Sequence, residues 1–221
     1  MAAVAARMNP RLRGLYVITE DRALGAEEAR VAVHAALRGG ASLVQYRDKS
    51  DDRQCRLATA TALQTLCAHF QVPLLINDDV DLACAVGADG VHLGRDDMAI
   101  EYARARLPAG SLIGVSCYNR FDLAQRAAAG GADYVAFGSF FASPTKPQAV
   151  AATPDLLRRA RTELSVPTVA IGGISPENGA ALVRAGADML AVISAVFAAP
   201  DVTAAARAFA PCFNPAEEAR P

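Results

Sequence analysis

Lysine is nearly absent from this chain. Only Lys49 and Lys146 occur among 221 residues, whereas twenty residues are arginine. Both lysines follow a short apolar run that reads as a β-strand. A compact, mobile ammonium can follow a phosphate group as a point charge or form a Schiff base, whereas the planar guanidinium of arginine has a fixed fork geometry. We therefore treat the two lysines as candidate functional residues.

Paired cysteines and a metal-binding cysteine motif are also missing. The chain has five cysteines, an odd number, and no two of them form a C-x-x-C pair. Disulfide frameworks usually have an even number of cysteines and zinc sites commonly contain C-x-x-C, so we expect reduced and mostly buried thiols.

A strong charge of either sign and a long apolar run are absent as well. The net charge is -1 and the signs are interspersed, which argues against a nucleic-acid partner. No run reaches membrane-spanning length, and residues 1–13 lack the apolar core of a signal peptide. We expect a cytoplasmic protein with no membrane partner, and the sequence leaves homo-oligomer formation open.

Short apolar runs rich in valine, isoleucine and leucine recur eight times along the chain. They cover residues 14–19, 42–47, 73–77, 90–94, 111–116, 134–139, 167–172 and 189–194. Stretches with helical spacing lie between them, at 26–38, 53–70, 121–129, 154–163 and 176–185. Strands that alternate with helices predict a parallel sheet.

A finer repeat supports this count. Gly-Ala followed by Asp or Ser precedes the second, fourth, sixth and eighth runs, beginning at Gly40, Gly87, Gly131 and Gly186. A four-fold βαβα unit predicts an α/β fold, a single (β/α)8 TIM barrel over residues 14–213. Short tails, 1–13 and 214–221, flank this barrel domain. An open doubly wound sheet is the alternative, although its glycine-rich first turn is missing.

Polar residues gather where the predicted strands end, which is the face of such barrels that carries chemistry. Gln45 and Arg47 share strand parity, and Lys49 continues this side into the loop. Asp78 and Asp97 follow neighbouring strands, so that their carboxylates could hold one Mg²⁺ ion. The alternative for Arg47, Asp48 and Lys49 is local ion pairing. The alternative for Asp78, Asp79 and Asp97 is helix capping.

A second phosphate-sized site is predicted near the last two strands. Gly172 and Gly173 precede a helix start, and Ser194 follows the next strand; loops at these places often hold phosphate. His92 lies within a strand, and we interpret it as a packed, hydrogen-bonded residue. Cys117 has no base nearby in the pattern, which argues against a nucleophilic role.

Seven motifs together resemble the thiamine phosphate synthase family over residues 14–213. They are Gln45-Tyr46-Arg47-Asp48-Lys49, Ile76-Asn77-Asp78, Gly90-Val91-His92-Leu93-Gly94, Gly114-Val115-Ser116, Ser143-Pro144-Thr145-Lys146-Pro147, Ala170-Ile171-Gly172-Gly173-Ile174 and Val192-Ile193-Ser194. The resemblance implies a transferase that joins a pyrimidine diphosphate to a thiazole phosphate and releases diphosphate. It also implies that the diphosphate leaves before the thiazole nitrogen attacks.

The resemblance further implies a role for each site residue. The catalytic residues would be Arg47, Lys49, Ser116 and Lys146. Asp78 and Asp97 would bind Mg²⁺. The substrate contacts are Gln45, Tyr46, Arg47, Asp48, Lys49, Asn77, Ser116, Ser143, Pro144, Thr145, Lys146, Gly173, Ile193 and Ser194. Arg95 departs from the family, which usually has glutamine there, and Ser143 and Ser139 replace a frequent threonine and proline.

Three other functions remain open at this stage. A thiazole tautomerase of the same barrel family would need neither the aspartate pair nor the lysines. An aldolase would form a Schiff base on Lys49 or Lys146 and would need a desolvated lysine. A non-catalytic phosphate-binding barrel would bind the ligands without turnover.

Overall fold

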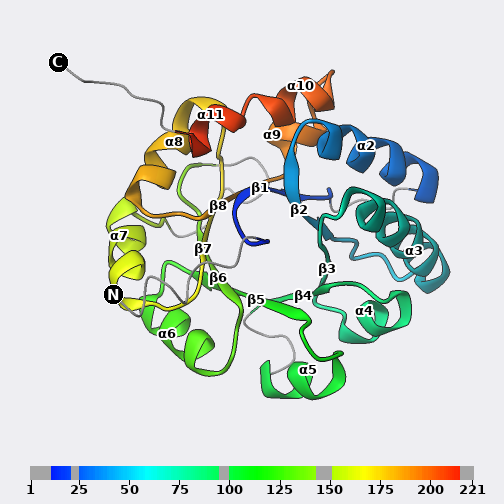
Figure 1. The fold of residues 1–221 in the computed structure, drawn as a ribbon, viewed down its shortest axis with the longest axis horizontal. Coiled ribbons are helices and arrows are strands. Elements are labelled where there is room, and N and C mark those ends of the chain that lie inside the picture. Colours follow the sequence, from blue (N-terminus) through cyan, green and yellow to red (C-terminus); the bar gives the residue numbers. More distant parts are fainter. Residues whose placement is uncertain (1–10, 21–24, 95–99, 143–150, 215–221) are drawn as a thin grey trace.

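Eight parallel strands close into a barrel in the computed structural model, which describes residues 11–20, 25–94, 100–142 and 151–214 (Figure 1). Each strand pairs with the next one along the chain, and β1 also pairs with β8. The strands are β1 (Gly14–Ile18), β2 (Ala41–Tyr46), β3 (Leu74–Asn77), β4 (Gly90–Leu93), β5 (Leu112–Tyr118), β6 (Tyr134–Gly138), β7 (Thr168–Ile171) and β8 (Met189–Val192). The predicted barrel is confirmed, and the open-sheet alternative is excluded because β1 and β8 are hydrogen-bonded.

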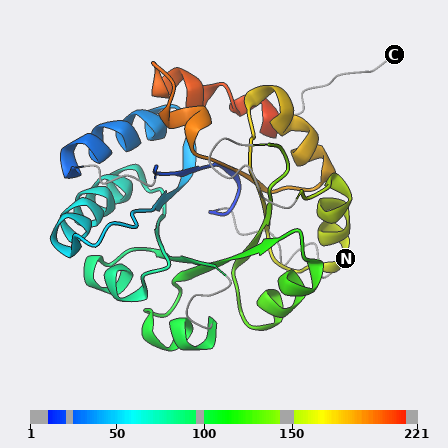
Figure 2. The ribbon, with the colours of Figure 1, turned by 180° about the vertical axis from the view of Figure 1, so that it is seen from behind.

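Helices surround the barrel on its outside (Figure 2). They are α2 (Ala26–Arg38), α3 (Arg53–Phe70), α4 (Val80–Val86), α5 (Ile100–Arg106), α6 (Phe121–Ala129), α7 (Pro154–Glu163), α8 (Pro176–Ala185), α9 (Ser194–Phe197), α10 (Val202–Arg207) and α11 (Ala210–Phe213). The five helices predicted from spacing have the predicted bounds. Within the described ranges, none of the helices is both long and apolar enough to cross a membrane.

Two strand ends differ from the sequence prediction by two residues, whereas the other strand bounds agree with it to within one residue. β5 continues to Tyr118 instead of ending at Ser116, because the pairing with β6 shifts register between these two residues. Such a bulge re-aims the side chains around it. Ser194 does not end β8 but begins the short helix α9.

The core has two layers separated by the barrel wall. The larger cluster, including Leu63, Ile113 and Leu157, lies between the strands and the helices. A smaller cluster fills the barrel itself and contains Tyr16 and Tyr134 among its aliphatic residues. The interior is therefore packed, as this fold requires, and two of its large members are polar at one end.

The Gly-Ala-Asp repeat fastens each odd strand to the even strand after it. The aspartates are Asp89, Asp133 and Asp188, and their carboxylates accept the backbone N–H of Leu74 (3.0 Å), Ile113 (2.7 Å) and Thr168 (2.7 Å). At the first repeat Ser42 takes this place and donates its hydroxyl to the Leu15 carbonyl (3.0 Å). The repeat thus ties neighbouring strands together, which adds a physical role to the pattern that indicated the strand count.

We expect Asp188→Ala to lower the free energy of unfolding by about 2 kcal/mol, because it leaves the buried Thr168 N–H without its acceptor. Asp155→Ala is the control, since Asp155 pairs only locally with Arg158 on an exposed face of α7. Urea unfolding followed by circular dichroism measures both. Equal unfolding midpoints for the two variants would contradict the fastening role.

Candidate active site

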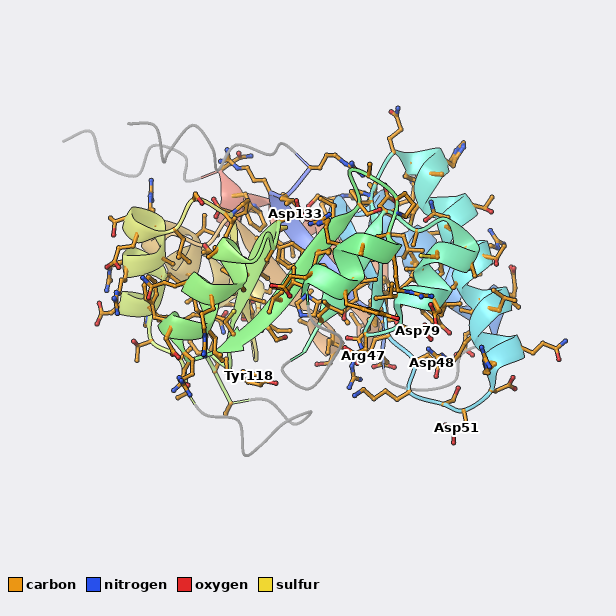
Figure 3. All side chains as sticks on the ribbon, turned by 90° about the horizontal axis from the view of Figure 1, so that it is seen from below. Arg47, Asp48, Asp51, Asp79, Tyr118 and Asp133 are labelled. Atoms are coloured by element: carbon orange, nitrogen blue, oxygen red, sulfur yellow. The ribbon has the colours of Figure 1, made fainter. Side chains whose placement is uncertain are left out.

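The charged candidates lie at the end of the barrel where the strands finish. Figure 3 shows Arg47, Asp48, Asp79 and Tyr118 at this mouth and Asp133 at the opposite end. Five predicted site residues lie outside the described residues, namely Asp97, Ser143, Pro144, Thr145 and Lys146. Arg95 lies outside them as well. The remaining predicted site residues can be placed.

The end of β2 holds Gln45 and Arg47. Gln45 is 2% exposed, and its amide nitrogen donates to the Tyr16 hydroxyl inside the barrel. Thr19 clamps the backbone of Arg47: its Oγ1 accepts the Arg47 N–H (2.9 Å) and donates to the Arg47 carbonyl (3.1 Å). β1 therefore fixes the position from which the guanidinium reaches the mouth.

The side chains of Tyr46 and Asp48 point away from the side of the strand that carries Gln45 and Arg47. Tyr46 has the opposite strand parity to Gln45, so its ring packs between the sheet and the helices. Its hydroxyl donates to Asp48 (2.9 Å), which also accepts the Ser50 N–H (2.8 Å). The structure gives both residues a role in shaping the turn that carries Lys49, and their substrate contacts stay a prediction.

The hydrogen bonds in this turn shift two pKa values. Burial and the hydrogen bond to Asp48 raise the pKa of Tyr46. Burial also raises the pKa of the Asp48 carboxyl, but hydrogen bonds from Ser50 and Tyr46 outweigh it and bring the pKa below its usual value. Asp48 therefore stays ionised at neutral pH and holds the turn.

A corner at the ends of β2 and β3 brings Lys49, Asn77 and Asp78 together. The Asn77 amide donates to Asp78 Oδ2 (2.6 Å), and the Lys49 Nζ lies 3.9 Å from the same oxygen. Asp78 has a left-handed backbone with φ 63°, and its N–H donates to the His92 carbonyl on β4 (2.9 Å). Residues held in such strained conformations cluster at functional sites.

Helix capping is the role of the next aspartate. Asp79 is the N-cap of α4 and accepts the Leu82 N–H (2.8 Å), and it also accepts a bond from Arg56 (2.7 Å). The capping alternative is therefore right for Asp79. Asp78, which precedes the cap, directs its carboxylate to the Lys49 corner instead.

The Asp78 carboxylate fits one ligand position of a hard cation. Its side chain is 32% exposed at the mouth, and Mg²⁺ commonly uses one or two carboxylates and takes its other ligands from water and phosphate. Across the part of the chain that the structure describes, no three or more His, Cys, Asp or Glu residues form a ready-made cage. The corner therefore suits an ion that arrives with a phosphorylated ligand.

Gly173, Ile193 and Ser194 lie at the ends of β7 and β8. Gly173 has φ +60°, and a Cβ there would lie 2.5 Å from the Ala142 carbonyl and 2.8 Å from Phe141 Cβ. Glycine is thus needed both for the turn and for the close packing of the β6 loop. Ile193 is half-buried at the barrel end, and the exposed Ser194 begins α9.

Sequence reasoning missed the polar chain inside the barrel. Tyr16 and Tyr134 bond to each other (2.9 Å) although 118 positions separate them, and Tyr134 bonds to His92 Nδ1 (2.8 Å). His92 Nε2 in turn bonds to Ser116 Oγ (2.9 Å). His92 is therefore packed and hydrogen-bonded, as predicted. No local pattern could have paired the two tyrosines.

Cys117 is not a nucleophile. It is fully buried, and burial raises the pKa of its thiol to about 12. A thiol of that pKa stays protonated at neutral pH.

Comparisons with known proteins agree with one another. The family model described as thiamine monophosphate synthase matches residues 15–196. The thiamine-phosphate synthase of Thioalkalivibrio sulfidiphilus is 53% identical over 204 residues, covering 92% of this chain and 97% of its own. That of Azoarcus sp. is 53% identical over 206 residues, covering 93% of this chain and 100% of its own. A solved structure of thiamine phosphate pyrophosphorylase from Pyrococcus furiosus has TM-score 0.82 at 35% identity, covering 94% of this chain and 98% of its own.

We expect Asp78→Gly to be more stable than Asp78→Ala by about 1 kcal/mol, because only glycine adopts the left-handed backbone without strain. Gln71 is the control, since it has φ 57° at the end of α3. Gln71→Gly and Gln71→Ala should differ by a similar amount. Thermal unfolding checks both pairs, and an Asp78→Ala variant as stable as Asp78→Gly would contradict the strained backbone.

Proposed function

The chain belongs to the thiamine monophosphate synthase family, and we propose how its residues divide the work of the reaction. Its activity is the joining of 4-amino-2-methyl-5-(diphosphooxymethyl)pyrimidine to a thiazole phosphate, which gives thiamine phosphate and diphosphate. This makes the enzyme a transferase that acts on two small-molecule substrates. Relatives of this function match nearly the whole chain at about half identity.

In our proposal the bond to the diphosphate breaks first. The pyrimidine-methyl cation that forms is then trapped by the thiazole nitrogen, whose lone pair makes the new C–N bond. Negative charge accumulates on the departing diphosphate, so the site must supply positive charge where that group lies. Arg47, Lys49 and Lys146 are assigned to this task.

The observation that carries the proposal is the corner of Lys49, Asn77 and Asp78. It places a cation, an amide and a carboxylate within one hydrogen-bonded group at the mouth. Asp78 and Asp97 would hold Mg²⁺, which when bound supplies charge to the diphosphate oxygens. The Lys49 contact with Asp78 joins two partly exposed groups, and such a pair is worth only about 0–1 kcal/mol. Lys49 can therefore turn to the diphosphate at little cost.

The remaining assignments concern substrate binding. Gln45, Asn77 and Ser116 are proposed to hold the pyrimidine, with Tyr46 and Asp48 in the turn beside it. The thiazole phosphate is assigned to Ser143, Pro144, Thr145, Gly173, Ile193 and Ser194. The half-buried Ile193 side chain packs against the barrel interior and supports an apolar contact there.

The alternatives find less support. A Schiff-base aldolase needs a desolvated lysine, and Lys49 has a side chain that is 57% exposed. A thiazole tautomerase would have no use for the Lys49 and Asp78 corner. Cytoplasmic location, self-association and the preferred thiazole form stay predictions or open questions.

The direct experiment mixes the purified protein with Mg²⁺, the pyrimidine diphosphate and the thiazole phosphate, and detects thiamine phosphate by chromatography. Product should form only when both substrates are present. A non-catalytic barrel would give none. Aldolase chemistry would instead appear as borohydride trapping of a carbonyl substrate on a lysine.

For the metal we expect Asp78→Gly and Asp97→Ala to lose most of the Mg²⁺-dependent turnover while keeping the fold. Each variant removes one carboxylate ligand, so the Mg²⁺ concentration needed for half-maximal rate should rise at least tenfold. Gln71→Gly, distant from the mouth, should titrate like the wild type. Unchanged Mg²⁺ curves in both aspartate variants would contradict the metal assignment.

For the leaving group we expect Lys146→Ala to slow bond formation by on the order of a hundredfold, with a smaller effect on substrate binding. Loss of one donor at a developing anion typically costs about 3 kcal/mol. Lys146→Arg should recover only part, since its planar fork directs its donors differently. Single-turnover rates measure the effect, and thermal midpoints separate it from a loss of stability. Wild-type rates in Lys146→Ala would refute the role.

A further inference from the structure

A continuous chain of hydrogen bonds crosses the barrel interior from Gln45 on β2 to Ser116 on β5. The Gln45 amide nitrogen bonds to Tyr16, and the Tyr16 and Tyr134 hydroxyls lie 2.9 Å apart. Tyr134 bonds to His92 Nδ1 (2.8 Å), and His92 Nε2 bonds to Ser116 Oγ (2.9 Å). The two ends of this chain are predicted substrate contacts, whereas its three middle members have no role in the reaction so far.

The middle members of this hydrogen-bond chain are buried in the core. Tyr16, Tyr134 and His92 are 1%, 0% and 8% exposed. The His92 ring stacks on Tyr134 with centroids 5.7 Å apart, and Tyr16 meets Tyr134 edge-on at 6.0 Å. A Cβ on Gly114 would lie 1.9 Å from the Tyr134 ring, so only glycine leaves room for that ring.

Counting protons gives the chain one direction. The Gln45 N–H donates to the Tyr16 oxygen, and the arrangement that then uses every proton inside the barrel has the single Tyr16 proton donated to Tyr134. The single Tyr134 proton then goes to His92 Nδ1, which must be an acceptor. A neutral imidazole carries its proton on the other nitrogen, and Nε2–H donates to Ser116. The Ser116 proton is left to point away from the chain.

We propose that Tyr16, Tyr134 and His92 are positioning residues whose one-way chain makes Ser116 a hydrogen-bond donor toward the heterocycle of the pyrimidine substrate. The proposal rests on the proposed function, which places Gln45 and Ser116 at the pyrimidine. A donor at Ser116 selects a ring that presents an acceptor, such as a ring nitrogen. The direction of the chain thus contributes to the choice of heterocycle.

Two features support the proposal. Burial raises the pKa of both Tyr16 and Tyr134, so each hydroxyl keeps the proton that the chain needs. Ser116 is also half-buried rather than closed into the core, and it lies on β5 where the pairing with β6 shifts register.

The first experiment needs no turnover. Protein labelled with ¹⁵N-histidine has only three imidazoles, and His34 and His69 are exposed on helices, so the His92 signals can be assigned by single replacements of those two. We expect His92 to carry its proton on Nε2. Gln45→Glu replaces the donor by an acceptor of the same shape, so it should reverse the chain and move the His92 proton to Nδ1. A wild-type proton on Nδ1, or an unchanged tautomer in folded Gln45→Glu, would overturn the proposal.

The second experiment uses steady-state kinetics. Tyr134→Phe removes the link and should raise KM for the pyrimidine diphosphate on the order of tenfold, while KM for the thiazole phosphate stays within twofold. In a Ser116→Ala background the same change should have little further effect, because the chain no longer reaches the substrate. Additive effects of the two changes would contradict coupling through the chain.

Thr168→Val is the matched control, since it removes a fully buried hydroxyl that bonds to the Gly186 carbonyl at the other end of the barrel. It should lower the thermal midpoint and leave both KM values unchanged. If Tyr134→Phe behaves like Thr168→Val, its role is structural only and the proposal fails. If the wild type makes no thiamine phosphate, the proposed function fails, whereas the tautomer measurement still tests the chain.

Discussion

Closure of eight parallel strands into one ring is the constraint on which the rest of this molecule depends. Because β1 pairs with both β2 and β8, every backbone group of the wall can find a partner and all strands finish at one mouth. The Gly-Ala-Asp repeats fasten the opposite end, where aspartate carboxylates accept backbone N–H groups of the preceding strand. The repeat is therefore a stability device, which leaves the mouth to chemistry.

Closure also decides what can lie inside. An inward-facing side chain has no solvent, so a polar one must find its partner within the barrel. Gln45, Tyr16, Tyr134 and His92 solve this by bonding to each other in sequence from wall to wall. A fully satisfied network of this kind rigidifies its members, and here its two ends lie at the predicted substrate site.

Much of the fold was predictable from local pattern. The alternation of apolar runs and helical spacing predicted the barrel, and the bounds of helices such as α3 and α8 were right because each is long enough to show its period. α4, α9, α10 and α11 have only four to seven residues, too few for a period to stand out. The bulge after Ser116 depends on the pairing with β6, which no local signal reports.

The candidate site was predictable only in part, because local sequence signals report some of its residues and not its long-range pairings. Strand parity and the position just beyond a strand identified Gln45, Arg47 and Lys49, since both are properties of the local chain. The same rule places the Tyr46 side chain toward the helices, where it bonds to Asp48, so the predicted substrate contact of Tyr46 rests on the family resemblance alone. The pairing of Tyr16 with Tyr134 joins residues 118 positions apart and follows only from closure of the ring.

The described part of the site is suited to binding charged groups and offers no activated protein nucleophile. Cys117 is buried with a raised pKa, and in the proposed proton arrangement the neighbouring Ser116 hydroxyl accepts a hydrogen bond from His92 instead of losing its proton to it. In the proton arrangement derived above, His92 has no free lone pair with which to act as a base toward Ser116. Lys49, Asn77 and Asp78 meanwhile form a polar corner suited to a phosphorylated ligand and its cation. These features fit a substitution in which the leaving group departs unaided by a protein nucleophile and the second substrate supplies the electron pair.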